Sequence, residues 1–246
     1  MSVKRGLLLV ALAFALAPLS VLADTLDFTI CITSTCSNAN ALGGTISYAG
    51  GASALVGTNI VVDSVTDTTT NVTYDLNDGT GTGFGVLSFT SGANTGGWNF
   101  GAGGSITITA PCIDSDLDEA DFCGSGDDTL ASGALGANTF LLGSISSASV
   151  VGNGGAFNVA IVLGSDQKDI NMLNLFGITP PTGWDAGANV SFSISPTVKV
   201  GDAFTSSSLG SGDVVNTPTP EPSSLLLLGT GLLGLGGAIR RRIIGA

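Results

Sequence analysis

The chain has 246 residues, 19 of them acidic and 7 basic, and it contains no histidine. Five of the basic residues lie at the two ends, so the part between them holds Lys168 and Lys199 as its cations, and such an acidic chain excludes nucleic-acid binding because it repels phosphate backbones. Without histidine, the usual general base of serine and cysteine hydrolases and the usual zinc ligand are missing.

Residues 1–23 have the pattern of a secretory signal peptide. Lys4 and Arg5 precede an apolar run from Gly6 to Ala17, and small residues then lead to Ala23. A run of about twelve apolar residues is too short for a membrane span, which needs about 20. We therefore expect export through the Sec translocon and cleavage by signal peptidase between Ala23 and Asp24.

Short apolar segments separated by glycine-rich turns fill residues 24–216. Several alternate strictly, as Ile106 and Ile108 do with the threonines beside them, which is typical of an antiparallel sheet with one face on a core. The strands that we expect are 25–33, 44–49, 58–65, 71–76, 84–90, 104–110, 139–145, 156–163 and 189–195. They predict one all-β domain, an antiparallel β-sandwich of the jelly-roll kind, with a β-solenoid as the alternative.

All four cysteines, Cys31, Cys36, Cys112 and Cys123, lie in the exported part. An even number in an oxidising compartment predicts two disulfides, for which three connectivities exist. We expect Cys31 to pair with Cys36 and Cys112 with Cys123, because these pairs close the shortest loops. Zinc binding is disfavoured, since neither spacing is Cys-x-x-Cys.

The densest charge cluster is CIDSDLDEADFCGSGDD, residues 112–128. Carboxylates at alternate positions are typical of the opening of a calcium loop. The candidate ligands are Asp114, Asp116, Asp118 and Asp121. Glu119 stands where an EF-hand needs glycine and Ser125 where it needs a bidentate glutamate, so an EF-hand is excluded. A looser calcium site and a solvated acidic loop both stay open, and calcium is the cofactor for which the sequence offers ligands.

The two tryptophans, Trp98 and Trp184, lie in stretches rich in glycine or proline. An exposed ring there could stack on a sugar, although packing in the core is the commoner role of tryptophan. Further along, residues 165–177 carry Ile170, Leu173 and Phe176 at a spacing of three. This spacing predicts one short helix, with Ser165 or Asp166 as its N-cap.

Residues 217–246 combine a proline-rich start, an apolar run and a basic cluster. The 17 residues from Ser223 to Ile239 carry no charge, and as a helix they would span about 25 Å of a bilayer. Arg240, Arg241 and Arg242 would then stay on the cytoplasmic side. We expect a transmembrane helix at 223–239 that anchors the chain transiently.

Pro220, Glu221 and Pro222, followed by the Leu/Gly-rich helix and the arginine cluster, resemble the PEP-CTERM sorting signal of Gram-negative bacteria. The resemblance is confined to this segment and the N-terminal signal peptide. It implies that exosortase processes the chain near the motif, that Glu221 is recognised and is not a catalyst, and that the product reaches the outer surface or the extracellular space in association with exopolysaccharide.

We therefore expect a non-catalytic protein of the cell surface or biofilm matrix. Removal of the signal peptide and of everything after Glu221 leaves 2 lysines against 19 acidic residues, a net charge of −17. The alternatives are a carbohydrate- or calcium-binding module and a glycoside hydrolase that works with two carboxylates.

Overall fold

The computed structural model describes residues 25–30, 44–76, 83–114, 129–153, 155–179, 184–193 and 197–218. The strands are β1 (Leu26–Ile30), β2 (Thr45–Tyr48), β3 (Ala54–Asp67), β4 (Val72–Asp75), β5 (Gly85–Gly96), β6 (Asn99–Phe100), β7 (Ser105–Thr109), β8 (Thr139–Asn153), β9 (Ala156–Lys168), β10 (Trp184–Ser193), β11 (Phe204–Thr205) and β12 (Ser208–Pro218). The helix α2 covers Ile170–Leu175.

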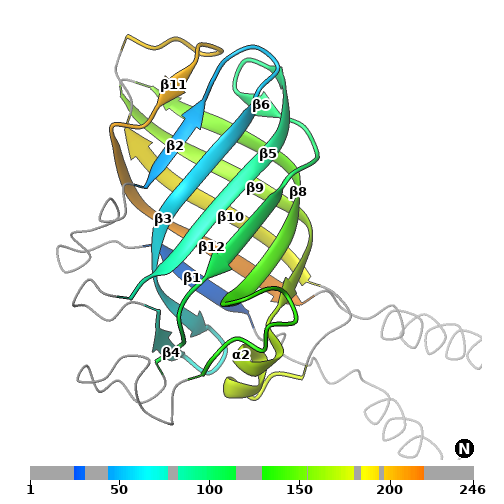
Figure 1. Ribbon diagram of the computed structural model, residues 1–246. Helices are drawn as coiled ribbons and strands as arrows, with labels where there is room; N and C mark the ends of the chain where they lie inside the picture. The colour runs from blue at the N-terminus through cyan, green and yellow to red at the C-terminus, as the bar shows by residue number, and fades with distance from the viewer. Residues whose placement is uncertain are drawn as a thin grey trace, which may run out of the picture. The chain divides into compact units, whose positions relative to one another are not determined.

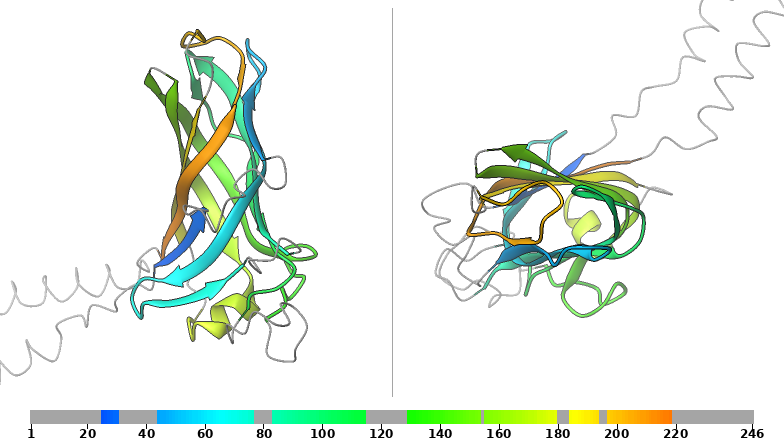
Figure 2. Two further views of the ribbon diagram at one scale, coloured as in Figure 1. Left: turned by 90° about the vertical axis from the view of Figure 1, so that its left-hand side faces the viewer. Right: turned by 90° about the horizontal axis from the view of Figure 1, so that it is seen from above.

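Antiparallel hydrogen bonds join these strands into a single 12-stranded sheet that closes on itself (Figures 1 and 2). The ring runs β1, β3, β5, β7, β8, β9, β10 and β12, and β12 pairs with β1 again. Apart from this last pairing, each strand of the ring lies beside the next ring strand along the chain. The short strands β2, β4, β6 and β11 add to this ring.

The prediction of an all-β antiparallel domain is confirmed, whereas the two-sheet jelly-roll sandwich is wrong, and so is the β-solenoid. A jelly roll would place strands distant in sequence side by side, but here successive strands pair through hairpins. The connection between β8 and β9 shows why: Asn153 pairs with Ala156, and Gly155 between them adopts a φ of 95°, which glycine tolerates. Long twisted strands joined in this way coil until the first and last meet.

Alternation along the strands directs apolar side chains into the interior of the closed sheet. β9 shows the pattern, with Phe157, Val159 and Ile161 buried and the residues between them exposed. Towards β11 the interior is aromatic: the Trp98 ring centroid lies 5.3 Å from those of both Phe157 and Phe204. The helix α2 lies at the opposite end from β11 (Figure 1) and buries Met172 and Leu173.

Most expected strands are present, but β3, β5, β8 and β9 are longer than expected, and β6, β11 and β12 were not predicted. The predicted helix exists, yet it is shorter than 165–177 and both proposed caps are wrong. Ser165 and Asp166 belong to β9, and the N-cap is Asp169, whose side chain accepts from the Asn171 backbone N–H at 3.0 Å. The strand alternation that buries Asp166 and Lys168 prevails over the helical spacing that follows.

Among the described residues, no helix is long and apolar enough to cross a membrane. The predicted signal peptide, residues 1–23, and the predicted transmembrane helix, residues 223–239, lie outside those residues.

Candidate functional site

A cluster of polar side chains lies in the interior of the closed sheet near α2. We call it the Lys168 cluster: Asp166 and Lys168 from the end of β9, Asn216 from β12 and Trp184 from the start of β10, all of them buried. A register shift in the pairing of β8 with β9 leaves both Gly164 and Ser165 exposed. This shift makes Asp166 and Lys168 continue the inward-facing row of β9.

Lys168 contacts each of the other three residues. Its Nζ forms an ion pair with Asp166, donates a hydrogen bond to Asn216 Oδ1 at 2.7 Å and lies 4.3 Å from the centroid of the Trp184 ring. The Asn216 Nδ2 donates to the backbone oxygens of Leu26 at 3.2 Å and Val214 at 3.1 Å. Because two carbonyls hold its Nδ2, the amide presents its oxygen to the lysine.

Burial dominates the electrostatics of this cluster. It lowers the pKa of Lys168 from 10.5 to about 8, although the charge of Asp166 and its hydrogen bond act in the opposite direction. Near neutral pH, the amine is therefore neutral far more often than an exposed lysine would be. A buried ion pair is weak evidence for stability alone, because its desolvation offsets much of the attraction.

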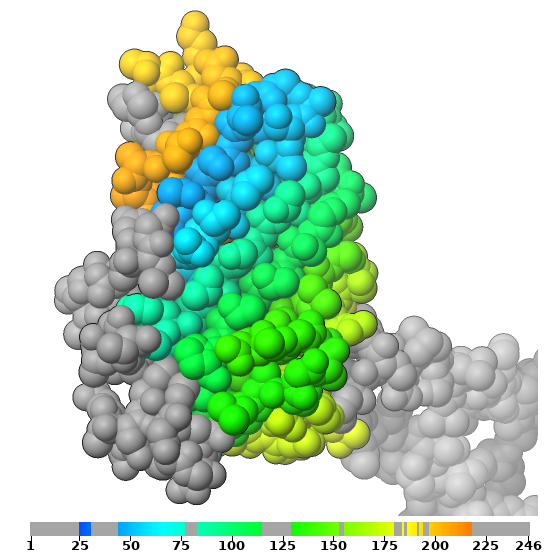
Figure 3. Space-filling model, viewed as in Figure 1, coloured from blue at the N-terminus to red at the C-terminus, as the bar shows by residue number. Residues whose placement is uncertain are grey.

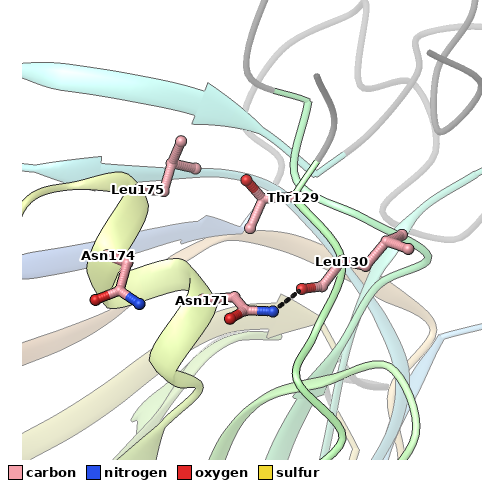
Figure 4. Close-up of a pocket in the computed structure, with 5 residues that line it drawn as sticks. All are labelled: Thr129, Leu130, Asn171, Asn174 and Leu175. Atoms are coloured by element: carbon pink, nitrogen blue, oxygen red, sulfur yellow. Dashed lines mark hydrogen bonds between the residues drawn. The ribbon is translucent and has the colours of Figure 1, made fainter. Parts of the chain in front are cut away.

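An open hollow of about 490 Å³ lies beside α2 and is lined by Thr129, Leu130, Asn171, Asn174 and Leu175 (Figure 4). Asn171 Nδ2 donates to the Leu130 backbone oxygen at 3.0 Å, which ties the helix to the segment after residue 128. The exposed amide of Asn174 leaves polar groups at the rim.

The predicted calcium ligands are described only in part. Asp114 is 5% exposed and its backbone N–H donates to the Asp75 oxygen at 3.0 Å. Asp116, Asp118 and Asp121 lie outside the described residues. Within the described part of the chain, no group of three or more acidic, cysteine or histidine side chains is placed to hold a metal ion. The calcium site stays a prediction.

Cys112 is fully buried and is not a free thiol. Cys31, Cys36 and Cys123 lie outside the described residues, so the pairing of the four cysteines stays a prediction.

The two tryptophans are core residues, and the alternative of exposed sugar-stacking rings is wrong. Trp98 is 2% exposed and its Nε1 donates to the Asp202 backbone oxygen at 3.0 Å. Trp184 is 7% exposed and faces Lys168. Trp98 lies in the turn before β6, and Trp184 is the first residue of β10.

Sequence reasoning missed Lys168 and Asn216 as members of one site. A signal for Lys168 was present, since Asp166 and Lys168 alternate at the strand period, but the helix pattern that follows obscured it. No local pattern marks Asn216, which lies near the lysine because β12 and β9 both pair with β10.

The first and last strands of the domain are neighbours, with Leu26 opposite Asn216. Because β12 ends at Pro218, a single residue separates it from the motif Pro220, Glu221 and Pro222. The motif, the Arg240 to Arg242 cluster and the predicted cleavage residues Ala23 and Asp24 lie outside the described residues. In the sequence, the predicted signal-peptide cleavage site and the sorting motif therefore adjoin strands that pair with each other.

Comparison with known proteins gives one match. Residues 218–242 match the PEP-CTERM protein-sorting motif. No curated protein and no solved structure matches the chain. The chain therefore carries a C-terminal PEP-CTERM protein-sorting motif, which makes it an exosortase-targeted protein exported across the membrane to the cell surface.

Proposed function

We propose that the β domain is the cargo of this sorting motif: a non-catalytic protein of the cell surface or biofilm matrix that associates with exopolysaccharide. The observation that carries the proposal is the junction of fold and motif, because the matched segment starts at Pro218, the last residue of β12. The folded domain is thus delivered as one unit without a long linker.

The packed interior supports a structural role. The ring strands enclose the side chains of a continuous apolar core, in which Tyr48 contacts Phe100, and Trp98 contacts Phe157, edge to face. The hydrogen-bonding groups of Trp98 and Asn216 bind backbone carbonyls. These contacts stabilise the fold. The polar groups that make them are therefore not available to bind a substrate.

The outer face is suited to weak polar contacts with polysaccharide. Figure 3 shows β3, β5 and β8 forming part of a continuous surface. Among the strands of the ring, the exposed hydroxyl and amide side chains include Thr90 on β5, Ser144, Ser146 and Ser147 on β8, and Asn158 and Gln167 on β9. Of the lysines, Lys168 is buried and Lys199 exposed. Because the processed protein would carry a net charge of −17, divalent cations are the natural bridge between it and acidic sugars.

Sorting is tested by cell fractionation and intact mass in a host that contains exosortase. We expect the mature chain to lack the arginine cluster and to leave the membrane fraction. Glu221→Gln should retain the C-terminal segment and stay with the membrane. Glu119→Gln is the matched control, because Glu119 is the chain's other glutamate. Equal processing of all three chains would contradict exosortase recognition of Glu221.

Polysaccharide association is tested by co-sedimentation of the purified mature protein with the host's exopolysaccharide. We expect binding that needs millimolar calcium and disappears with chelator, since like charges repel otherwise. Turnover of the polysaccharide that a single Asp→Asn change abolishes would support a glycoside hydrolase and overturn the non-catalytic proposal.

A carbohydrate-binding module is the second candidate, favoured by the hollow beside α2. Exposed asparagine amides offer donors and acceptors to sugar hydroxyl groups, and Leu130 and Leu175 supply an apolar floor. Asn174→Ala would weaken micromolar, calcium-independent glycan binding at this hollow, whereas Asn158→Ala on the outer face of β9 would leave it unchanged.

A further inference from the structure

The Lys168 cluster brings together the three groups that a covalent cross-link needs: an amine, a carboxamide and a carboxylate. Lys168 Nζ lies 2.7 Å from Asn216 Oδ1. The amide carbon Cγ, which the amine would attack, is bonded directly to this oxygen. Asp166 contacts the same Nζ. We propose that Lys168 and Asn216 become joined by an intramolecular isopeptide bond, with Asp166 transferring the protons.

Burial of the cluster favours the neutral, reactive amine over the charged ion pair. All three side chains are at most 7% exposed, so water competes little for the amide carbon. In a low-dielectric interior, transfer of a proton from the ammonium to the carboxylate gives two neutral groups. The lowered pKa of Lys168, about 8, reflects the same destabilisation of its charge by burial. A neutral, desolvated lysine amine is a good nucleophile.

The amide is held in place for attack. Asn216 Nδ2 donates to the Leu26 and Val214 backbone oxygens, and Oδ1 accepts from Lys168, so rotation of the amide would break several hydrogen bonds. The Trp184 ring, at 4.3 Å from Nζ, restricts the amine on another side. Preorganisation of this kind replaces the entropy cost of bringing two reactants together.

The step balances without any other reactant. Asp166 takes a proton from Nζ, and the amine lone pair forms a bond to Cγ of Asn216. The carboxyl group of Asp166 gives a proton to Nδ2 and accepts a second one from Nζ, and the Cγ–Nδ2 bond then breaks. The products are a secondary amide between the two side chains and one molecule of ammonia.

The bond would lock the strand that leads to the sorting motif. β9 and β12 both pair with β10, so the link passes across β10 and ties the last strand to the middle of the sheet. A domain on the outside of a cell cannot be refolded by cytoplasmic chaperones, and a covalent link keeps β12 in place. The inference concerns the folded domain alone and does not depend on exopolysaccharide binding.

Intact-mass measurement of the mature, reduced and denatured protein tests the proposal. We expect a mass lower than that of the processed sequence by about 17 Da, the mass of ammonia. Proteolysis should release a branched peptide that joins residues 168 and 216.

Three variants complete the test. Lys168→Arg keeps the charge without an available nucleophile and Asp166→Asn removes the proton carrier, so both should show the full sequence mass. Lys199→Arg, at the exposed lysine, should keep the deficit. Circular dichroism checks that each variant folds. Wild-type protein at its full sequence mass would overturn the proposal and leave an ordinary buried ion pair. A deficit that persists in Lys168→Arg, as a succinimide at another asparagine would give, would also overturn it.

Discussion

Asn216 on β12 lies opposite Leu26 on β1, and its side-chain amide donates to the Leu26 backbone oxygen at 3.2 Å. This contact joins residues 190 positions apart and reinforces the pairing of β1 with β12 that closes the sheet. It also places the strand that follows the predicted signal peptide beside the strand that leads into the sorting motif. The predicted signal-peptide cleavage site and the sorting motif therefore both lie close in sequence to the two strands that close the sheet.

The first prediction concerns that seam. A chain that ends at Ser207 lacks β12, so β1 and β10 each lose a partner strand and the interior opens to water. We expect such a chain to lose cooperative unfolding in circular dichroism and to be cut rapidly by protease. A chain that ends at Pro218 keeps every ring strand and should unfold cooperatively. Equal unfolding transitions for the two chains would show that closure is not needed for stability.

The second prediction concerns the aromatic end of the core. Trp98→Ala should lower the free energy of unfolding by about 3–5 kcal/mol, because it leaves a large cavity against Phe157 and Phe204. Val200→Ala is the control, since Val200 is 69% exposed and should change stability by less than about 0.5 kcal/mol. Urea denaturation measures both values. A similar small effect for both variants would contradict the packed core at this end.

The third prediction is a dependence of stability on pH. Burial, and then the nearby charge of Asp213, raise the pKa of Asp27 above its ordinary value of 3.8. The folded chain then holds this proton more tightly than the unfolded chain, so this residue's contribution to stability falls as the pH rises from about 4 through the raised pKa. Asp27→Asn should therefore stabilise the protein at pH 7, by less than about 1 kcal/mol because the site is half exposed.

The same gain should vanish below about pH 3.8, where Asp27 is protonated in both the folded and the unfolded chain. Asp213→Asn should give part of the gain, and the double variant less than the sum of the two, because both remove one repulsion. Thermal unfolding at pH 3 and pH 7 measures these differences. A gain of equal size at both pH values would refute the electrostatic cause.

The fourth prediction concerns the start of α2. Asp169 is fully buried and accepts hydrogen bonds from the backbone N–H groups of Asn171 at 3.0 Å and Ser132 at 2.9 Å, and from the Ser132 hydroxyl. Asp169→Ala leaves these donors unsatisfied and should cost about 2–4 kcal/mol in unfolding free energy. Ser132→Ala removes one donor together with its hydrogen bond and should cost about 1 kcal/mol. Equal costs for the two variants would mean that Asp169 acts through Ser132 alone.

Sequence alone predicted the strands that carry strict alternation, such as β7 and β10, because a period of two needs no partner to be recognised. It failed for β12, whose sequence SLGSGDVVNTP holds several glycine and small polar residues. This segment forms a strand because β1 and β10 supply hydrogen-bonding partners on both sides. Tertiary context thus overrides a weak local preference.

The candidate site was predicted even less well. Asp166 and Lys168 lie two residues apart on one strand, but their alternation was masked by the helical spacing of Ile170, Leu173 and Phe176. Asn216 is 48 residues from Lys168, and no local pattern distinguishes it from the chain's other asparagines. The acidic segment stood out in the sequence, yet of its four candidate ligands Asp114 is the one described, and it is buried.

The sequence by itself determined where this protein goes and what kind of domain it carries. The apolar runs, prolines and arginines of its ends are local features, and so is the alternation that specifies an antiparallel all-β fold. Only the tertiary structure decided that the strands form one closed sheet and that Lys168, Asp166 and Asn216 meet inside it. Those outcomes depend on pairing between distant strands, which is selected by the burial of the whole core.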